Sequence, residues 1–269
     1  MMTTIALAIL AGVPAQPPEL KLTNVRTTIG ELGPPRENNK LLPGDYLFFA
    51  FDIEGLTINA DGNTRYVMSM EVTDAAGKVW LPKNPVEKSD FIPLRGNRIP
   101  ARAYVIAGLD YPPGNYTCKL SVTDPKTKAT GSLTMKYEVA KKDFGIVLVN
   151  TSYDPQGTIS APTTGQVGQT IFISFSVVAF ERDMKTKQPN VEIVIDILDE
   201  KNASLGQPLK HIQDDKSALP VKATDDVFRL PYQLFLTRPG KFTVQITATD
   251  NVSKKKATFK VPVTVMAAN

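Results

Sequence analysis

Apolar and polar residues alternate with a period of two along most of this chain. Between residues 46 and 53, for example, every second residue is large and apolar. This period is typical of β-strands that bury one face, and no stretch shows the wider apolar stripe of a helix. The pattern predicts an all-β protein with strands at residues 20–25, 46–53, 66–72, 78–81, 98–107, 116–122, 133–139, 145–150, 170–177, 191–197, 228–236, 242–248 and 259–265.

The strand pattern occurs twice along the chain. Gly114 begins a turn and a strand whose second copy begins at Gly240, 126 positions later. The two strands end at Asp124 and Asp250, which are again 126 positions apart. A repeat of this length, with Gly and Pro clusters between the strands, indicates two similar domains rather than one large one.

The copies can be matched strand by strand. The first strands match at the same interval of 126, residues 22–24 with residues 148–150, and later strands match at intervals of 124 to 126. Each copy has about seven short strands, which fits an immunoglobulin-like β-sandwich of roughly 100 residues plus loops. We therefore predict two tandem immunoglobulin-like β-sandwich domains, residues 16–141 and 142–269. The short junction between them favours one preferred inter-domain angle.

Three segments depart from the simple alternation. Residues 82–97 and 206–226 are polar and interrupted by Pro, and they do not match each other. We predict loops there, each with at most one short edge strand, and such loops often carry the function of a sandwich domain. The last strand contains Pro262, which cannot donate a ladder hydrogen bond, so that strand is expected at a sheet edge.

Residues 110–118 resemble the start of strand F in the immunoglobulin superfamily, where Asp, Gly, Tyr and Cys recur at fixed spacing. The resemblance implies that Tyr116 forms a tyrosine corner. Cys118 has the spacing of the bridging Cys, but it is the only Cys in the chain and has no partner. In the second copy Phe242 and Val244 stand at these two positions.

The turns at Gly114 and Gly240 and the strands after them are also similar to fibronectin type III-like and polycystic-kidney-disease-type modules of bacterial secreted proteins. This resemblance covers about a dozen residues in each copy. It implies a fold rather than an activity.

The N-terminal residues resemble a secretory signal. A short apolar run at residues 5–11 is followed by small residues up to Ala15, and the run is too short to span a bilayer. We expect a signal peptide at residues 1–15 and a secreted or periplasmic protein. The alternative is an N-terminal arm that is disordered or pairs with a sheet edge. No second apolar segment follows, so no membrane span is expected.

The charge pattern argues against a nucleic-acid partner. The formal net charge is +4, and the basic runs, Lys141–Lys142 and Lys254–Lys256, lie where turns or strand starts are expected. A nucleic-acid surface would need more Lys and Arg interleaved with aromatic residues. Solvated charges that discourage edge pairing explain these runs better.

Few residues suit catalysis or metal binding. His211 is the only His, no Gly-x-Ser-x-Gly motif occurs, and one His with one Cys cannot make a zinc site. Cys118 is expected to be a buried, inert thiol. No cofactor is expected. Calcium stays open, because six aspartates at strand ends could cluster, although turn formation explains them more simply: Asp61, Asp74, Asp110, Asp124, Asp199 and Asp250.

Two aromatic residues are expected on the outer face of the second strand of each copy. Phe48 and Phe172 occupy the same position in the repeat, on the face that is otherwise polar. They either contact a loop or the neighbouring domain, or they form a patch that binds a partner, since exposed aromatic side chains favour interfaces.

These patterns together favour a non-enzymatic, secreted or periplasmic protein that acts as a binding or structural interaction module. Its partner would be a protein or a polysaccharide. One alternative is a periplasmic assembly chaperone, which would present the strand at residues 133–139 for donor-strand pairing. Another is an accessory or inhibitor module of a secreted enzyme.

Overall fold

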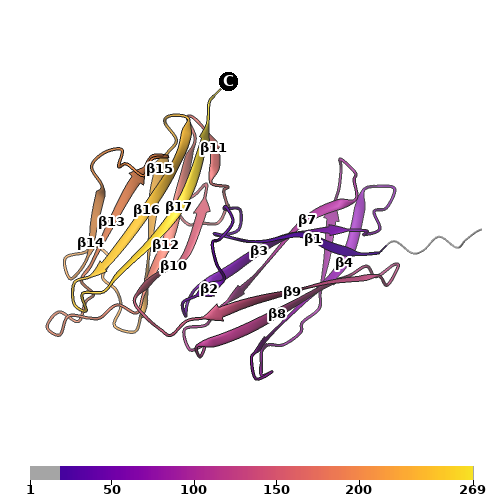
Figure 1. Ribbon diagram of the computed structural model, residues 1–269, viewed down its shortest axis with the longest axis horizontal. Helices are drawn as coiled ribbons and strands as arrows, with labels where there is room; N and C mark the ends of the chain where they lie inside the picture. Colours follow the sequence, from indigo (N-terminus) through magenta and orange to yellow (C-terminus); the bar gives the residue numbers. More distant parts are fainter. Residues whose placement is uncertain (1–18, 269) are drawn as a thin grey trace, which may run out of the picture.

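The computed structural model describes residues 19–268, and these residues form an all-β protein (Figure 1). Two pairs of β-sheets make two immunoglobulin-like sandwiches, one after the other along the chain. The strands of the first sandwich are β1 (Lys21–Thr28), β2 (Lys40–Leu41), β3 (Tyr46–Glu54), β4 (Asn63–Asp74), β5 (Val79–Leu81), β6 (Val86–Phe91), β7 (Arg98–Ile106), β8 (Gly114–Thr123) and β9 (Thr130–Val139). The expected signal peptide, residues 1–15, lies outside the described residues.

The second sandwich follows after a five-residue connection, residues 140–144. Its strands are β10 (Gly145–Ser152), β11 (Thr164–Gln166), β12 (Thr170–Val178), β13 (Val191–Leu198), β14 (Leu209–Gln213), β15 (Val227–Phe235), β16 (Gly240–Asp250) and β17 (Lys256–Met266). In Figure 1 it lies beside the first sandwich, and the C-terminal end projects from its far end.

The two sandwiches have the same strand topology except for the extra strand β5 in the first. One sheet of each has three strands, in the order β1-β3-β7 and β10-β12-β15. The facing sheets run β2-β9-β8-β4-β5, with β6 also paired to β4, and β11-β17-β16-β13-β14. A short strand, β2 or β11, pairs in parallel with the last strand of each sandwich. All other strand pairs are antiparallel, as tandem immunoglobulin-like domains require.

Each sandwich has its own hydrophobic core between its sheets. The alternation predicted from the sequence is confirmed most clearly in β3 and β12, where the apolar residues of one face are almost completely buried. They are Leu47, Phe49, Phe51 and Ile53 in the first core and Ile171, Ile173, Phe175 and Val177 in the second. On the opposite face most side chains of β3 are half-buried, whereas Ser174, Ser176 and Val178 of β12 are buried as well.

The predicted match of the first strands is wrong by two residues. Asn24 and Leu148 both adopt positive φ, 51° and 54°, within β-bulges of β1 and β10. When β1 and β10 are aligned through their partner strands β3 and β12, equivalent residues are 124 positions apart rather than 126. A bulge adds one residue to one strand only and shifts the phase of the alternation at that point, so a regular alternation could not fix this register.

The polar middle segments each contain one short strand, as predicted. These strands, β6 and β14, pair with β4 and β13 at the outer edge of the larger sheets. The prediction of an edge position for the last strand is incomplete. β11 pairs with Thr264–Met266 at the end of β17, and Pro262 lies just before this pairing, where no donor is needed.

Candidate functional site at the domain joint

The two sandwiches are joined by contacts between the start of β3, the β1–β2 loop and strand β10. Asp45 follows a tight turn in which Asp45 N–H donates to Leu42 O and Gly44 N–H donates to Ala107 O. The second sandwich has the same turn, where Gln169 takes the place of Asp45. The backbone of this turn is therefore common to both copies, and the side chain of Asp45 is what differs.

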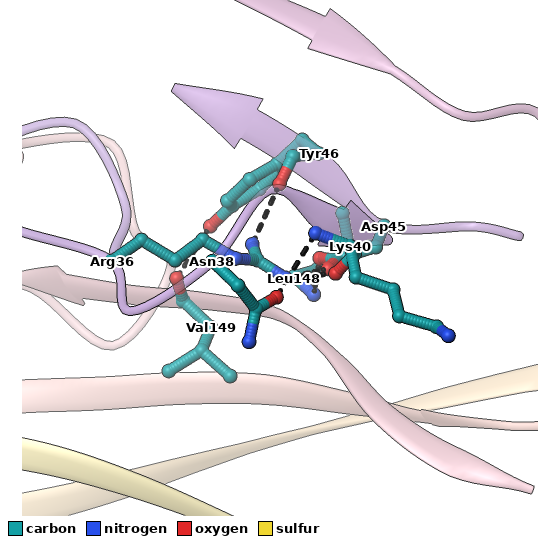
Figure 2. A network of polar contacts seen from close by, with 7 residues as sticks. All are labelled: Arg36, Asn38, Lys40, Asp45, Tyr46, Leu148 and Val149. Carbon is teal, nitrogen blue, oxygen red and sulfur yellow. Dashed lines mark hydrogen bonds and ion pairs between the residues drawn. The ribbon is translucent and has the colours of Figure 1, made fainter. Parts of the chain in front are cut away.

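The Asp45 carboxylate connects both domains. Its Oδ2 accepts a hydrogen bond from Arg36 at 2.8 Å, and its Oδ1 accepts the Leu148 backbone N–H of β10 at 2.9 Å (Figure 2). The side chains of Arg36 and Asp45 are only 13% and 6% exposed. Leu148 presents its N–H because it lies in the bulge of β10, outside the regular ladder.

Tyr46 makes a second bond between the domains. Its hydroxyl donates to Val149 O at 2.9 Å, beside the Asp45 bond (Figure 2). Burial raises the pKa of Tyr46, and the neighbouring Asp45 carboxylate raises it further, so the hydroxyl stays protonated and able to donate. Arg36 completes the network by donating to Tyr46 O at 3.1 Å and to Lys40 O at 3.2 Å.

The β1–β2 loop extends the joint into the second sandwich. Ile29 is buried within the second hydrophobic core, although it belongs to the first half of the chain. Gly30 has a φ of 65° and packs so closely on Asn150 that a Cβ would clash with the Asn150 side chain. Glu31 accepts a hydrogen bond from Ser160 Oγ at 2.6 Å. These contacts couple the loop to β10 and to the segment that follows it.

A groove of about 530 Å³ runs beside this joint between the two sandwiches. Polar and charged side chains from both domains line it, among them Asn38, Lys40, Thr258 and Lys260. Lys40 is paired with Glu138 at 3.0 Å on the surface. The groove can therefore hydrogen-bond a polar surface, while the hydrogen bond from Leu148 N–H to Asp45 connects its two walls.

Phe48 and Phe172 lie at equivalent positions and are both half-buried. Phe48 packs edge-on against Tyr46, with ring centroids 4.7 Å apart, and lies 5.2 Å from the Tyr104 ring across the strand pair. Phe172 pairs across the strands with Ser152 and Gln233 instead. The structure therefore places Phe48 beside the joint in an aromatic row, whereas Phe172 has polar neighbours on its paired strands.

Tyr116 lies at the centre of an aromatic stack. Its hydroxyl donates to Pro112 O at 2.8 Å, which is the hydrogen bond of a tyrosine corner. Its ring stacks on Tyr111 and Tyr137, at 5.7 and 5.5 Å between centroids, and Trp80 covers Tyr111 at 4.7 Å. Phe242, its equivalent, has no hydroxyl, and Arg238 lies over its ring at 5.4 Å.

Cys118 is completely buried between the sheets of the first sandwich. Burial raises the pKa of its thiol to about 12. The two turn glycines, Gly114 and Gly240, have φ values of 154° and 143°, which residues with a side chain rarely adopt. All three positions belong to the packing around the turn and strand that the sequence repeats.

The strand-end aspartates mostly bond to backbone N–H groups of turns. Asp124 accepts bonds from Thr57, Lys126 and Thr127, and Asp250 accepts bonds from Glu181 and Val252. Asp61, Asp74 and Asp199 accept local bonds in the same way. Within residues 19–268 no group of three or more His, Cys, Asp or Glu side chains could hold a metal ion. His211 is exposed on β14.

The joint residues were not predicted from the sequence. Asp45 and Tyr46 resembled any strand start, and Arg36 lay in a Pro-rich loop. A signal was nevertheless present, because the second copy has Gln169 and Thr170 where the first has Asp45 and Tyr46. A carboxylate and a phenol occur in the first copy but not in the second. They mark the face on which the first copy meets its neighbour.

Comparisons with known proteins give only distant likenesses. No family model matches the chain, and no curated protein matches it. Among solved structures it is similar to the C-terminal domain of the Streptococcus pyogenes antigen I/II-family protein AspA, with 10% identity, a TM-score of 0.29 and coverage of 93% of this chain and 100% of that chain.

Two further structures show the same level of likeness. The Streptococcus agalactiae AgI/II polypeptide BspA C-terminal domain has 10% identity and a TM-score of 0.30, with coverage of 92% of this chain and 100% of that chain. Red sea bream transglutaminase has 8% identity and a TM-score of 0.27, with coverage of 93% of this chain and 31% of that chain. TM-scores this low imply nothing about the activity of the chain.

None of the described residues forms a helix long and apolar enough to cross a membrane.

Proposed function

We propose that this chain is a non-enzymatic binding or structural interaction module, secreted or periplasmic in a bacterium, made of two immunoglobulin-like domains at residues 16–141 and 142–269. The observation that carries the proposal is the buried joint. Asp45 accepts hydrogen bonds from both domains, and Ile29 of the first half packs in the second core. A joint of this kind holds two sandwiches in one orientation, which suits a module that presents surfaces to a partner.

The surface proposed for the partner consists of Phe48 and Tyr104 of the aromatic row with the adjacent Ile106, and these three residues are here called the aromatic patch. Phe48 is half-buried, while Tyr104 and Ile106 on β7 are 50% and 53% exposed. Rigid aromatic side chains with one apolar face are enriched in protein interfaces. The fitting partner is a protein or a polysaccharide, because aromatic side chains pack on apolar surfaces of both.

The test is capture of a partner from the native envelope fraction by the chain from Gln16 onward, with mass spectrometry and polysaccharide analysis of what stays bound. The double variant Phe48→Ala with Tyr104→Ala should lose the partner. Phe172→Ala, the matched position in the second sandwich, should keep it if the patch beside the joint is the binding surface. If the double variant folds and retains the same partner, the assignment of the patch is wrong.

A second candidate function is that of an assembly chaperone. The observation that favours it is the edge of β9, where β2 pairs only with Glu138 and Val139 among the described residues. An incoming strand could pair with the rest of this edge. This function predicts that the chain captures an unfolded subunit. Loss of this capture in Leu133→Pro on β9, but not in the patch variants, would favour the chaperone function over the first.

A further inference from the structure

The first sandwich contains a groove of about 840 Å³ between its two sheets, open along the edge strand β7. Volumes of this order are typical of sites for small molecules. Apolar and aromatic side chains from both sheets dominate the lining, and the ones used below are Met68, Met70, Ala101, Ala103, Tyr111 and Tyr137. One end of the groove reaches Glu31 of the joint and Tyr104 and Ile106 of the aromatic patch, but the residues used below do not belong to the Asp45 network.

The second sandwich shows what normally fills this position. Strand pairing places Ala103 opposite Phe49, and it places Tyr232 opposite the equivalent Ile173. In the same way Ala101 of the first sandwich corresponds to Leu230 of the second. The first sandwich therefore lacks a phenol ring and a branched aliphatic chain that the second sandwich packs against its core.

The facing strand reflects the same difference. Met68 and Met70 of β4 are only partly buried, whereas the equivalent Ile193 and Ile195 of β13 are buried. Loss of large side chains from a core leaves a cavity where the surroundings do not collapse. The two methionines border such a space, and thioether sulfur makes favourable contacts with aromatic rings.

One polar atom at this groove lacks a partner. Tyr137 is 4% exposed, and its hydroxyl has no hydrogen-bond partner among the described residues. Burial raises the pKa of Tyr137, so the hydroxyl stays protonated. A buried hydroxyl without a partner is rare in native proteins, and its partner is then ordered water or a bound molecule.

We propose that this groove binds a small para-substituted phenol or a close alkyl-aromatic analogue. Its ring would take the place that Tyr232 occupies in the second sandwich, next to Met68 and Met70. Its alkyl group would lie over Ala101, where the second sandwich has Leu230. Its hydroxyl would bond to Tyr137.

The proposal is tested with the full chain and two probes, para-cresol and toluene, followed through the NMR signals of methionine methyl groups. Titration with para-cresol should shift the methyl signals of Met68 and Met70 in a saturable way. Met184 is 85% exposed in the second sandwich and should not shift. Absence of saturable shifts at Met68 and Met70 would overturn the proposal.

Two variants distinguish specific binding in this groove from non-specific binding of the probes to apolar surface. Ala103→Tyr copies the second sandwich and should abolish binding of both probes. If this variant does not fold, the smaller Ala101→Leu should still weaken binding of both. Unchanged binding in whichever variant folds would contradict the assignment of the groove.

The role of the hydroxyl is tested by Tyr137→Phe, with Tyr232→Phe as the matched control. Loss of one hydrogen bond should weaken para-cresol binding by up to about tenfold and leave toluene binding unchanged. Tyr232→Phe should change neither affinity. Equal effects of Tyr137→Phe on both probes would show that the hydroxyl does not contact the ligand.

Discussion

At the scale of single residues, Cys118 occupies the position of a disulfide-forming Cys but is a free thiol. It stands two residues after Tyr116, at the spacing of a bridging Cys, but the facing strand β3 has Phe49 and Phe51. The thiol is fully buried, and burial raises its pKa to about 12. Its role is therefore that of a small apolar side chain in the first core.

This role predicts that Cys118→Val is tolerated. Val244 stands at the equivalent position, and a near-isosteric change in a core should cost less than about 1.5 kcal/mol in the free energy of unfolding. Denaturant unfolding of the variant measures this cost. In the native protein, the thiol should also resist a bulky thiol reagent at pH 8. Rapid labelling before unfolding would show that the thiol is accessible and would contradict its buried position.

Asp45 is the residue on which the joint depends most. Removing one partner of a buried ion pair leaves the other charge without compensation, and Asp45→Ala should lower the free energy of unfolding by roughly 3 kcal/mol. Gln169→Ala is the matched control in the second sandwich. Gln169 Oε1 accepts only the Gln166 backbone N–H, so its loss should cost about 1 kcal/mol. Equal costs in denaturant unfolding would contradict the special role of Asp45.

At the scale of elements, the turn that follows β8 in the first sandwich and β16 in the second depends on a carboxylate. Asp124 and Asp250 are almost fully buried, and each bonds to its own turn and to a loop from the facing sheet. A related turn begins at Asp183, whose carboxylate accepts the N–H groups of Lys185 and Thr186. The pKa values of Asp124 and Asp183 are lowered by these hydrogen bonds, since a carboxylate accepts them better than a carboxylic acid.

Acid should therefore weaken the fold. Hydrogen bonds from Trp80 hold the pKa of Asp74 below its usual range, the Lys255 ammonium does the same for Asp143, and backbone N–H groups of the turn do so for Asp183. A pKa that is lower in the folded state contributes stability above the unfolded value of 3.8, and this stability is lost as the pH falls through the folded value.

The measurement is the unfolding temperature, Tm, between pH 7 and pH 2.5. We expect little change above about pH 5 and a fall below about pH 4, where these carboxylates become protonated. Asp183→Asn should flatten part of the fall. A Tm that rises on acidification would contradict this assignment.

Much of the element scale could be predicted from the sequence, because apolar alternation follows directly from burying one face of a strand. Strands such as β3 and β12 were predicted in this way. The bulges at Asn24 and Leu148 were not, because a bulge depends on backbone pairing and interrupts the regular period of two on which the prediction rests. The groove was also missed, since Ala101 and Ala103 alternate correctly, and only their small size reveals it.

At the scale of the whole molecule, the joint makes the relation between the sandwiches part of the fold. Its residues come from a Pro-rich loop, a strand start and a bulge, which no periodic pattern connects. The Asp45 carboxylate and the Tyr46 hydroxyl link the two halves of the chain by hydrogen bonds to β10, and Ile29 links them by apolar burial. Hydrogen bonds and apolar burial at one place leave little freedom for hinge motion.

The central claim is that the two sandwiches move as one body, and NMR relaxation of backbone amides tests it most directly. Amides of β8 and β16 should report one rotational correlation time, that of the whole chain, in the native protein. Asp45→Ala should shorten the times and make them differ between the two sandwiches, while Gln169→Ala should leave them equal. Separate, shorter correlation times for the two sandwiches of the native protein would contradict the account.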